Sequence, residues 1–182
     1  MKAIFRQPAM LISLLLAGCA TRPPLTTVPF VDLNRYGGLW YEIAKYPNWF
    51  QAKCAGDTTA EYSAGPHGSV LVTNRCYRTD GSPCQVQGRA TVIPGSGNAK
   101  LRVRFPGSPF AGDYWIIGLD EKNYSWAVVG HPSRQFLWIL ARQPQISPSD
   151  QEMIFTLVEK RGYERNRIVP TPQNVLYKQS KP

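Results

Sequence analysis

The sequence predicts an all-β domain, either an up-and-down barrel or a sandwich, with a single helix near its C-terminal end. From residue 58 to residue 142, apolar and polar residues alternate with a period of two, which is the spacing of half-buried strands. Turn-forming residues interrupt this pattern at short intervals, so neighbouring strands are expected to be antiparallel. After residue 147 the apolar residues change to helical spacing. Evenly spaced antiparallel strands are typical of both all-β architectures.

Eight segments fit the pattern of strands separated by short turns. They are residues 39–46, 58–62, 70–74, 86–92, 101–105, 110–120, 124–130 and 136–142. Clusters of Gly, Pro, Asn, Asp and Ser separate many of them, and such clusters favour turns. We therefore expect eight antiparallel strands in sequence order.

The apolar faces of these strands define an interior. In the fifth segment, Leu101, Val103 and Phe105 alternate with lysine and arginine. Gly88 and Ala90 share the apolar face of the preceding segment, and we expect these small residues to leave space inside. An eight-stranded barrel is wide enough to hold one small ligand. The alternation therefore favours an apolar pocket of roughly 300–1,000 Å³.

One helix is expected after the last strand. Ser147 is a suitable N-cap, Pro148 suits the first helical position, and Asp150 occupies the third. Apolar residues then repeat at helical spacing until Gly162, where we expect the helix to end. A single amphipathic helix cannot bury its own apolar face, so it should pack outside the sheet. A short ninth strand is expected at 168–169.

The N-terminus resembles a bacterial lipoprotein signal. A short basic region precedes an almost wholly apolar run over 9–17, about half of what a membrane-spanning helix needs. The run ends in Leu16-Ala17-Gly18-Cys19, which matches the lipobox, whose cysteine thiol takes up a diacylglyceryl group. We expect a signal peptide at 1–18, lipidated Cys19 with a proline-rich extended tether at 19–31, and one domain at 32–182. The alternative is an ordinary signal peptide with a chance cysteine.

The chain is basic, with 21 Lys and Arg against 12 Asp and Glu. These charges alternate with apolar residues along the strands and form no dense cluster, so we expect no nucleic-acid partner. A basic protein with a lipid anchor can lie against anionic head groups, so the expected partner is a membrane. By resemblance to other lipoproteins, Ala20 after the acylated cysteine indicates the outer membrane, at its periplasmic face.

Three cysteines remain besides Cys19, which predicts one disulfide and one free thiol in an oxidising compartment. Cys76 and Cys84 are symmetric about Asp80 and lie opposite each other by simple counting. Pairing Cys54 with Cys76 instead requires a bend near the start of the first hairpin. The sequence contains no Cys-x-x-Cys motif, which weakens a redox or zinc function, and we expect no metal and no cofactor.

Three regions resemble the lipocalin family, and most of all its bacterial outer-membrane lipoprotein branch. The stretch 36–44 carries the family's Gly-x-Trp motif at Gly38 and Trp40. The stretch 112–120 is similar to the family's strand-F motif, although Gly112 stands where threonine is usual. The stretch 137–142 ends in Arg142, which matches the arginine that closes the barrel base. The resemblance covers about 32–168 and implies an eight-stranded antiparallel up-and-down lipocalin β-barrel with one C-terminal α-helix outside.

The resemblance also implies roles for individual residues. Gly38, Trp40 and Arg142 are structural, with the arginine lying over the tryptophan ring. The pair Cys54 and Cys76 forms the disulfide, and residues 47–53 form a lid or rim at the barrel mouth. Parity along the strands then gives the expected ligand contacts, which are Trp138, Tyr114, Phe136, Leu140, Ile116, Val103 and Phe105. Related bacterial lipocalins imply a fatty acid or lysophospholipid as ligand, for lipid transport or storage in the envelope. A homodimer is compatible with the resemblance.

An enzyme is not expected. His67 and His131 each lie in a turn beside glycine or proline, with no adjacent carboxylate in the sequence. Glu42 shares a face with Trp40, and we expect it to be a buried structural partner of an arginine or a backbone N–H. Two alternatives to lipid binding remain open: a lipocalin-like envelope enzyme, and a structural envelope lipoprotein without a ligand.

Overall fold

The computed structural model describes residues 22–174, so the signal segment and Cys19 lie outside the described residues. The strands are β1 (Gly38–Lys45), β2 (Gly56–Ala64), β3 (Val70–Tyr77), β4 (Pro83–Val92), β5 (Lys100–Arg104), β6 (Gly112–Leu119), β7 (Trp126–Gly130), β8 (Leu137–Ala141) and β9 (Val169–Pro170). The α-helices are α1 (Leu33–Tyr36) and α2 (Pro148–Lys160), and short 3₁₀ turns occupy Trp49–Gln51, Pro66–Gly68 and Arg165–Arg167.

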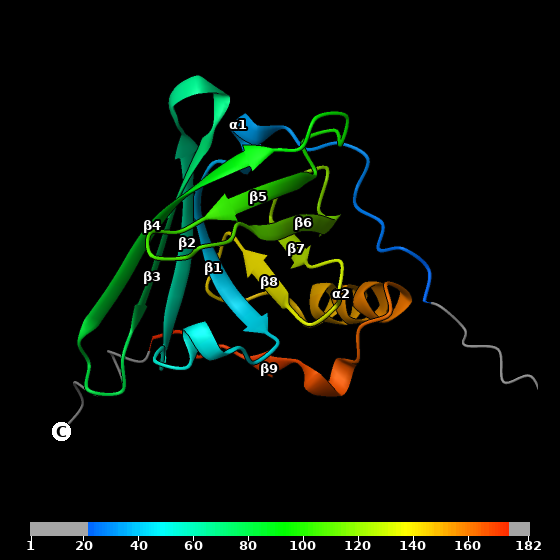
Figure 1. Cartoon of the computed structure of the whole chain (residues 1–182). Coiled ribbons are helices and arrows are strands. Elements are labelled where there is room, and N and C mark those ends of the chain that lie inside the picture. The colour runs from blue at the N-terminus through cyan, green and yellow to red at the C-terminus, as the bar shows by residue number, and fades with distance from the viewer. Residues whose placement is uncertain (1–21, 175–182) are drawn as a thin grey trace, which may run out of the picture.

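The strands close into a barrel rather than two stacked sheets. From β1 to β8 each strand pairs antiparallel with the next, and β1 also pairs with β8, which joins the ends of the sheet (Figure 1). This pairing settles the choice between barrel and sandwich in favour of the barrel. β9 adds to the end of β1, with Val169 opposite Lys45. The α1 helix lies at one end of the barrel, which we call the closed end.

The barrel wall separates two apolar clusters. The inner core contains Val31, Tyr36, Trp40, Ala60, Tyr62, Val72, Ala90, Leu101, Val103, Ile116, Val129 and Leu140 among others. The outer cluster lies between the wall and α2, and includes Ile117, Val128, Leu137, Ile139, Ile154 and Val158. Consecutive residues such as Ile116 and Ile117 therefore point to opposite sides of the sheet, as the period of a strand requires.

The α2 helix forms as expected. The Ser147 hydroxyl accepts a hydrogen bond from the backbone N–H of Asp150 at 3.0 Å, and Pro148 is the first helical residue. Gly162 follows the helix with φ of +82°, a backbone conformation that suits glycine. Ile154 and Val158 are fully buried against the outer face of the barrel. The helix therefore gives the wall a second packed layer on one side.

The N-terminal segment departs from the expected tether. Leu25, Val28 and Val31 are buried, and the backbone N–H groups of Val28 and Val31 donate to carbonyl oxygens of Ile116 and Gly97. The packed domain thus begins at about Leu25 rather than at residue 32. Apolar residues spaced by three among prolines carry no strand or helix periodicity, and this hides their packing role in the sequence.

Two local boundaries also differ from expectation. The sixth strand begins at Gly112, and Phe110 lies in the preceding loop with its side chain 79% exposed. The α1 helix was not expected, because four residues are too short to show a helical period. Its N-cap is Asp32, whose carboxylate accepts from the backbone N–H groups of Asn34 and Arg35.

A disulfide joins Cys54 to Cys76, with a Cα–Cα distance of 5.6 Å, as the family resemblance implied. Cys84 is opposite Cys76 in the β3–β4 register but is a free, buried thiol. The bridge ties the end of the 46–55 segment to the inner face of β3. Simple hairpin counting favoured the other pairing because it took no account of how this segment crosses the barrel mouth.

Replacing Cys54 and Cys76 together by serine is expected to lower the free energy of unfolding by about 3 kcal/mol, because the closed loop spans 22 residues. Urea denaturation of the two proteins under the same conditions measures the difference. The variant Cys84→Ser, which leaves the bridge intact, is the matched control. Non-reducing peptide mapping that links Cys76 to Cys84 would contradict the assignment.

Candidate functional site: the barrel interior

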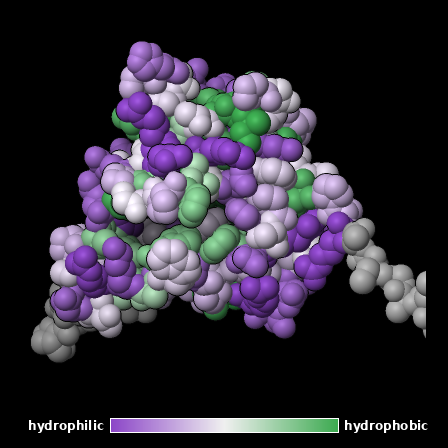
Figure 2. Space-filling view, in the orientation of Figure 1, coloured by the Kyte–Doolittle hydropathy of each residue, from purple (hydrophilic) through white to green (hydrophobic). Residues whose placement is uncertain are grey.

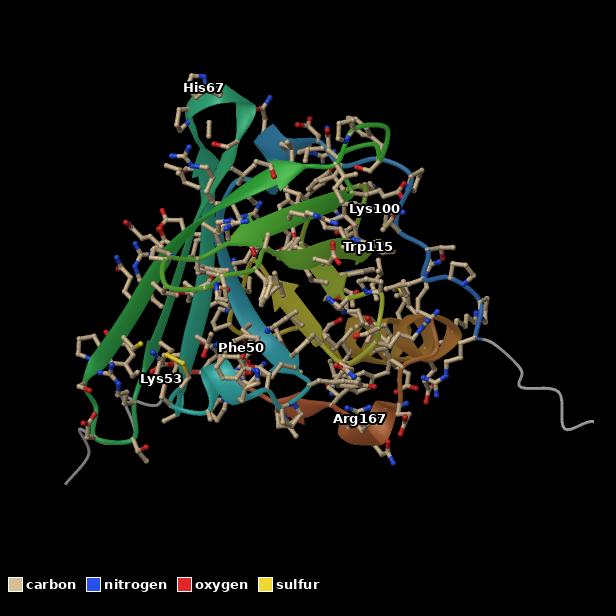
Figure 3. All side chains as sticks on the ribbon, in the orientation of Figure 1. Phe50, Lys53, His67, Lys100, Trp115 and Arg167 are labelled. Atoms are coloured by element: carbon tan, nitrogen blue, oxygen red, sulfur yellow. A yellow bond between two sulfur atoms is a disulfide. The ribbon has the colours of Figure 1, made fainter. Side chains whose placement is uncertain are left out.

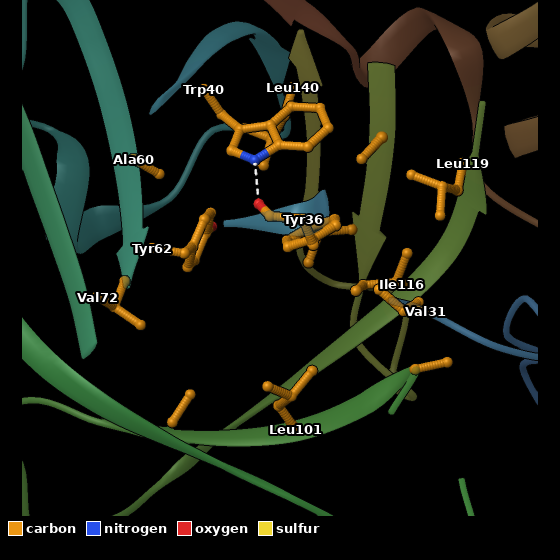
Figure 4. Close-up of a cluster of buried hydrophobic side chains, with 14 of the residues drawn as sticks. Val31, Tyr36, Trp40, Ala60, Tyr62, Val72, Leu101, Ile116, Leu119 and Leu140 are labelled. Atoms are coloured by element: carbon orange, nitrogen blue, oxygen red, sulfur yellow. Dashed lines mark hydrogen bonds between the residues drawn. The ribbon is translucent and has the colours of Figure 1, made fainter. Parts of the chain in front are cut away.

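Trp40 and Arg142 seal the closed end of the barrel. The indole of Trp40 is completely buried, and its Nε1 donates to the carbonyl oxygen of Tyr36 at 2.8 Å (Figure 4). The guanidinium of Arg142 lies 3.9 Å from the centre of the indole ring. It also donates to the carbonyl oxygens of Leu39, Arg35 and Gly37 at 2.6–2.8 Å. The floor is therefore a fixed stack, and these residues support the site rather than contact a ligand.

A cavity of about 330 Å³ lies inside the barrel, beside this floor. Its lining residues come from α1, the β2–β3 hairpin and the inner faces of β4, β5 and β6: Leu33, Asn34, Tyr36, Gly37, Tyr62, Ser63, Ala64, Gly65, Gly68, Ser69, Val70, Ala90, Leu101, Val103 and Tyr114. Figure 4 shows Tyr36, Tyr62, Val72 and Leu101 around the interior of the barrel. The volume is at the lower end of the range for small-molecule sites.

Three tyrosine hydroxyls meet in this cavity. The hydroxyl of Tyr114 is 2.8 Å from the hydroxyl of Tyr36 and 2.8 Å from that of Tyr62. Burial raises the pKa of all three phenols above the usual value, because an ionised phenolate would lose its hydration. The hydroxyls therefore stay neutral at physiological pH and act as hydrogen-bond donors and acceptors.

Aromatic side chains cover the opposite end, which we call the mouth. The ring of Phe50 lies 5.7 Å from Phe136 and 6.3 Å from Trp138, and the last two rings stack. Gln51 accepts a hydrogen bond from Nε1 of Trp138 at 2.9 Å, which holds the segment in place. Figure 2 shows apolar side chains around a hollow on this face, near Phe50, which is labelled in Figure 3. The expectation of a rim segment at 47–53 matches this placement.

Glu42 is 2% exposed, and its hydrogen bond to Gln51 helps to hold the 46–55 segment at the mouth. Its carboxylate accepts from Lys45 at 2.7 Å, from Gln51 at 2.7 Å and from the Thr171 hydroxyl at 2.6 Å. We expected an arginine or a backbone N–H as its partner, and the partners are instead a lysine, an amide and a hydroxyl. The carboxylate is fully occupied by these contacts, so it is structural.

The expected ligand residues divide between two levels of the barrel. Val103 and Tyr114 line the cavity, and Ile116 and Leu140 are buried in the inner core. The other three, Trp138, Phe136 and Phe105, are half-buried, and Trp138 and Phe136 lie at the mouth. The structure thus brings two of the seven to the cavity itself and places two more in the aromatic cover above it.

One feature of the expected pocket is wrong. Gly88 was expected to leave space inside, but a Cβ atom at this position would lie 2.6 Å from the ring of Phe105. The phenyl ring therefore occupies the space that the missing side chain leaves. Ala90 does line the cavity, as expected. The free space consequently lies nearer the closed end than strand alternation alone suggests.

Sequence reasoning missed Tyr36 and Tyr62 as cavity residues. They come from α1 and β2, and only the closure of the barrel brings their hydroxyls to Tyr114. Tyr62 is on the inward face of an expected strand, so parity could have found it. Tyr36 precedes the Gly-x-Trp motif in a segment without periodicity, and no pattern indicated its direction.

A serine, a histidine and an aspartate approach one another near the mouth, but they do not form a catalytic triad. Nδ1 of His131 lies 2.8 Å from the Ser133 hydroxyl and also accepts from the backbone N–H of Ser133 at 3.1 Å. The Asp113 carboxylate is 3.9 Å from Nε2 and 3.7 Å from Arg102. This is a turn in which the imidazole caps the backbone. Burial lowers the pKa of His131, which favours the neutral ring in this role.

Within residues 22–174, no group of three or more His, Cys, Asp or Glu side chains is placed to hold a metal ion. No helix in this part of the chain combines the length and the apolar character needed to cross a bilayer.

Comparison with known proteins identifies the family. The family profile of the lipocalin-like domain matches residues 31–173, which is most of the chain. The chain belongs to the lipocalin family. Its Gly-x-Trp floor, its closed eight-stranded barrel and its external helix are the features expected from the sequence resemblance.

Relatives agree with this assignment. The chain is 35% identical to the outer membrane lipoprotein Blc of Vibrio cholerae, over 95% of this chain and 99% of the relative. It is 35% identical to temperature-induced lipocalin-1 of Arabidopsis thaliana, over 82% and 83% of the two chains. Insecticyanin from Manduca sexta has the same fold, with a TM-score of 0.69 at 19% identity over 85% of this chain and 87% of that one.

These comparisons support binding of a lipophilic ligand. Membership of this family makes the chain a binding protein rather than an enzyme. The cavity beside the tryptophan floor is the candidate site for that ligand.

Proposed function

We propose that this lipocalin binds an acyl lipid, a fatty acid or a lysophospholipid, inside its barrel for transport or storage in the cell envelope. The observation that carries the proposal is the cavity of about 330 Å³, lined mainly by apolar surface from α1, the β2–β3 hairpin, β4, β5 and β6. Binding an acyl chain in this space is favourable, because it removes apolar surface of both the chain and the cavity from water.

The ligand would enter the barrel at the mouth. Phe50, Phe136 and Trp138 form an aromatic cover at the mouth, and the 46–55 segment that carries Phe50 is held by side-chain contacts rather than by a strand. An acyl chain entering past this cover reaches the inner core. The proposed ligand contacts are Trp138, Tyr114, Phe136, Leu140, Ile116, Val103 and Phe105.

The proposed location of the protein is the outer membrane. The Blc relatives are outer membrane lipoproteins by name, and Cys19 stands in a lipobox in this chain. Acylation of Cys19 would anchor the barrel at the periplasmic face of the outer membrane, because two or more acyl chains anchor a protein stably. The barrel would then take its ligand from the same membrane that holds its anchor.

Lipid binding is tested on purified Cys19→Ser protein, which keeps every residue of the barrel and cannot carry an acyl chain on a thiol at position 19. Native mass spectrometry followed by lipid extraction is expected to find one acyl lipid per barrel, and it also reports whether the protein is a homodimer. A protein that carries no lipid and takes up none on titration would support a structural envelope role instead.

The role of the mouth is tested by Trp138→Ala. Truncation of this half-buried side chain is expected to weaken binding of a fatty acid or lysophospholipid about tenfold while the barrel stays folded, because it removes part of the cover and not the floor. Trp115→Ala is the matched control, since Trp115 lies on the outer face beneath Lys100 (Figure 3). Equal loss of affinity in both variants would argue against the inward assignment of Trp138.

A further inference from the structure

The three cavity tyrosines leave one hydrogen without an acceptor. Tyr36, Tyr62 and Tyr114 carry three hydroxyl hydrogens, and the two contacts at 2.8 Å among them use two of these hydrogens. Within the described part of the chain, no other group makes a hydrogen bond to these hydroxyls. The triad therefore presents one free donor in a cavity that is otherwise mainly apolar.

The cavity contains no charge that would complement an anion. None of its lining residues is a lysine, arginine, histidine, aspartate or glutamate. Two partly buried cations already have partners, since Arg142 lies over Trp40 and bonds to three backbone carbonyls, and Lys45 pairs with Glu42 at 2.7 Å. A carboxylate or phosphate placed beside the triad would meet no cation among the lining residues and only one free hydroxyl donor of the triad.

The cost of removing a ligand group from water therefore differs between charged and neutral groups in this cavity. An ionised carboxylate loses its hydration on burial and has to be paired or protonated. An ester carbonyl or an alcohol needs only one or two hydrogen bonds, and the triad supplies one donor together with hydroxyl oxygens that can accept. The same desolvation that keeps the three phenols neutral would act against an anion beside them.

We propose that the tyrosine triad selects neutral acyl lipids, with an ester carbonyl or an alcohol at the hydroxyls, over fatty-acid anions. This inference rests on the proposed function, because it specifies which acyl lipids the same cavity takes. A monoacylglycerol or a fatty alcohol fits the description directly. A fatty acid fits in its protonated form, and a lysophospholipid fits only with its phosphate left outside the cavity.

The test compares two lipids with the same acyl chain, monomyristoyl glycerol and myristate, on delipidated Cys19→Ser protein at pH 8. Displacement of a fluorescent acyl probe measures both affinities. We expect the neutral lipid to bind at least tenfold more tightly. Lowering the pH to 5.5 should narrow the gap, because a larger fraction of myristate is protonated while the monoacylglycerol is unchanged.

The triple variant Tyr36→Phe, Tyr62→Phe, Tyr114→Phe tests the triad itself, because Tyr114→Phe alone would leave the hydroxyls of Tyr36 and Tyr62 free to bond to a ligand. Loss of all three hydroxyls should reduce the preference for the neutral lipid to less than threefold. Tyr163→Phe is the matched control, because Tyr163 is also a buried tyrosine but belongs to the cluster outside the barrel wall. Thermal unfolding checks that both variants are folded, and the wild-type comparison stands without them.

The outcomes separate the inference from the proposed function. Myristate binding as tightly as the monoacylglycerol at pH 8 overturns the selection of neutral lipids and leaves acyl-lipid binding intact. Failure of both lipids to displace the probe, together with no lipid in the purified protein, contradicts the proposed function and the inference with it.

Discussion

Replacing Trp40 by alanine is expected to lower the free energy of unfolding by about 3–5 kcal/mol, the cost of truncating a fully buried aromatic side chain. The indole is completely buried at the centre of the floor. Its removal leaves the Tyr36 carbonyl without the Nε1 donor at 2.8 Å and leaves Arg142 without the ring that it covers at 3.9 Å. Urea denaturation monitored by circular dichroism measures the change.

The matched control for this prediction is Trp49→Ala. Trp49 is the same residue type in the same chain, but its side chain is 83% exposed in the mouth segment. Its truncation should change the stability by no more than about 0.5 kcal/mol. A loss below about 1.5 kcal/mol for Trp40→Ala would mean that the floor does not depend on the indole, and the structural role of the motif would then be wrong.

The strands of the barrel could be predicted because each one shows its own alternation of apolar and polar residues. Alternation along β5 places Leu101 and Val103 inside without reference to any other strand, and the turns between strands are marked by glycine and proline. The external helix was predictable for the same reason, since Ser147 and Gly162 mark its ends locally. Local signals of this kind do not depend on the closure of the barrel.

The cavity could be predicted only in part because its shape depends on contacts between distant segments. Phe105 fills the space above Gly88, and this depends on how β4 and β5 approach each other rather than on either strand alone. Irregular register at β1 and at β6 changes which residues face inward along those strands. Counting alternate residues therefore no longer predicts the inward face beyond the irregularity between Ile116 and Gly118. It does predict the inward face correctly for Tyr114 and Ile116, which precede it.

The N-terminal segment shows a second limit of sequence reasoning. Proline-rich stretches such as residues 22–31 resemble linkers, but this one runs along the barrel with Leu25 in the outer cluster and Val31 in the inner core. The guanidinium of Arg134 donates to the carbonyl oxygen of Pro23 at 2.7 Å, which fixes the segment near the β7–β8 connection. Only three residues then separate Pro23 from Cys19, so that the four steps between them reach about 14 Å even when fully extended.

This short reach gives the anchor a structural consequence. If Cys19 is acylated, the barrel is held within a few residues of the bilayer surface and not on a long flexible linker. Replacing Cys19 by serine removes the thiol that would take up the diacylglyceryl group, and the barrel itself makes no described contact that depends on this residue. The folded protein should therefore be unaffected while its attachment to the membrane is lost.

Cys19→Ser is accordingly expected to move the protein out of the outer-membrane fraction almost completely, since it removes the thiol that would carry the acyl chains. Cell fractionation with immunoblotting measures the distribution, and mass spectrometry of the N-terminal peptide of the wild-type protein should find acyl chains on Cys19. Cys84→Ser, which alters a cysteine buried in the barrel, should stay in the membrane fraction. An unmodified Cys19, or a mature N-terminus elsewhere, would show that the lipobox is not used and that another segment holds the protein at the membrane.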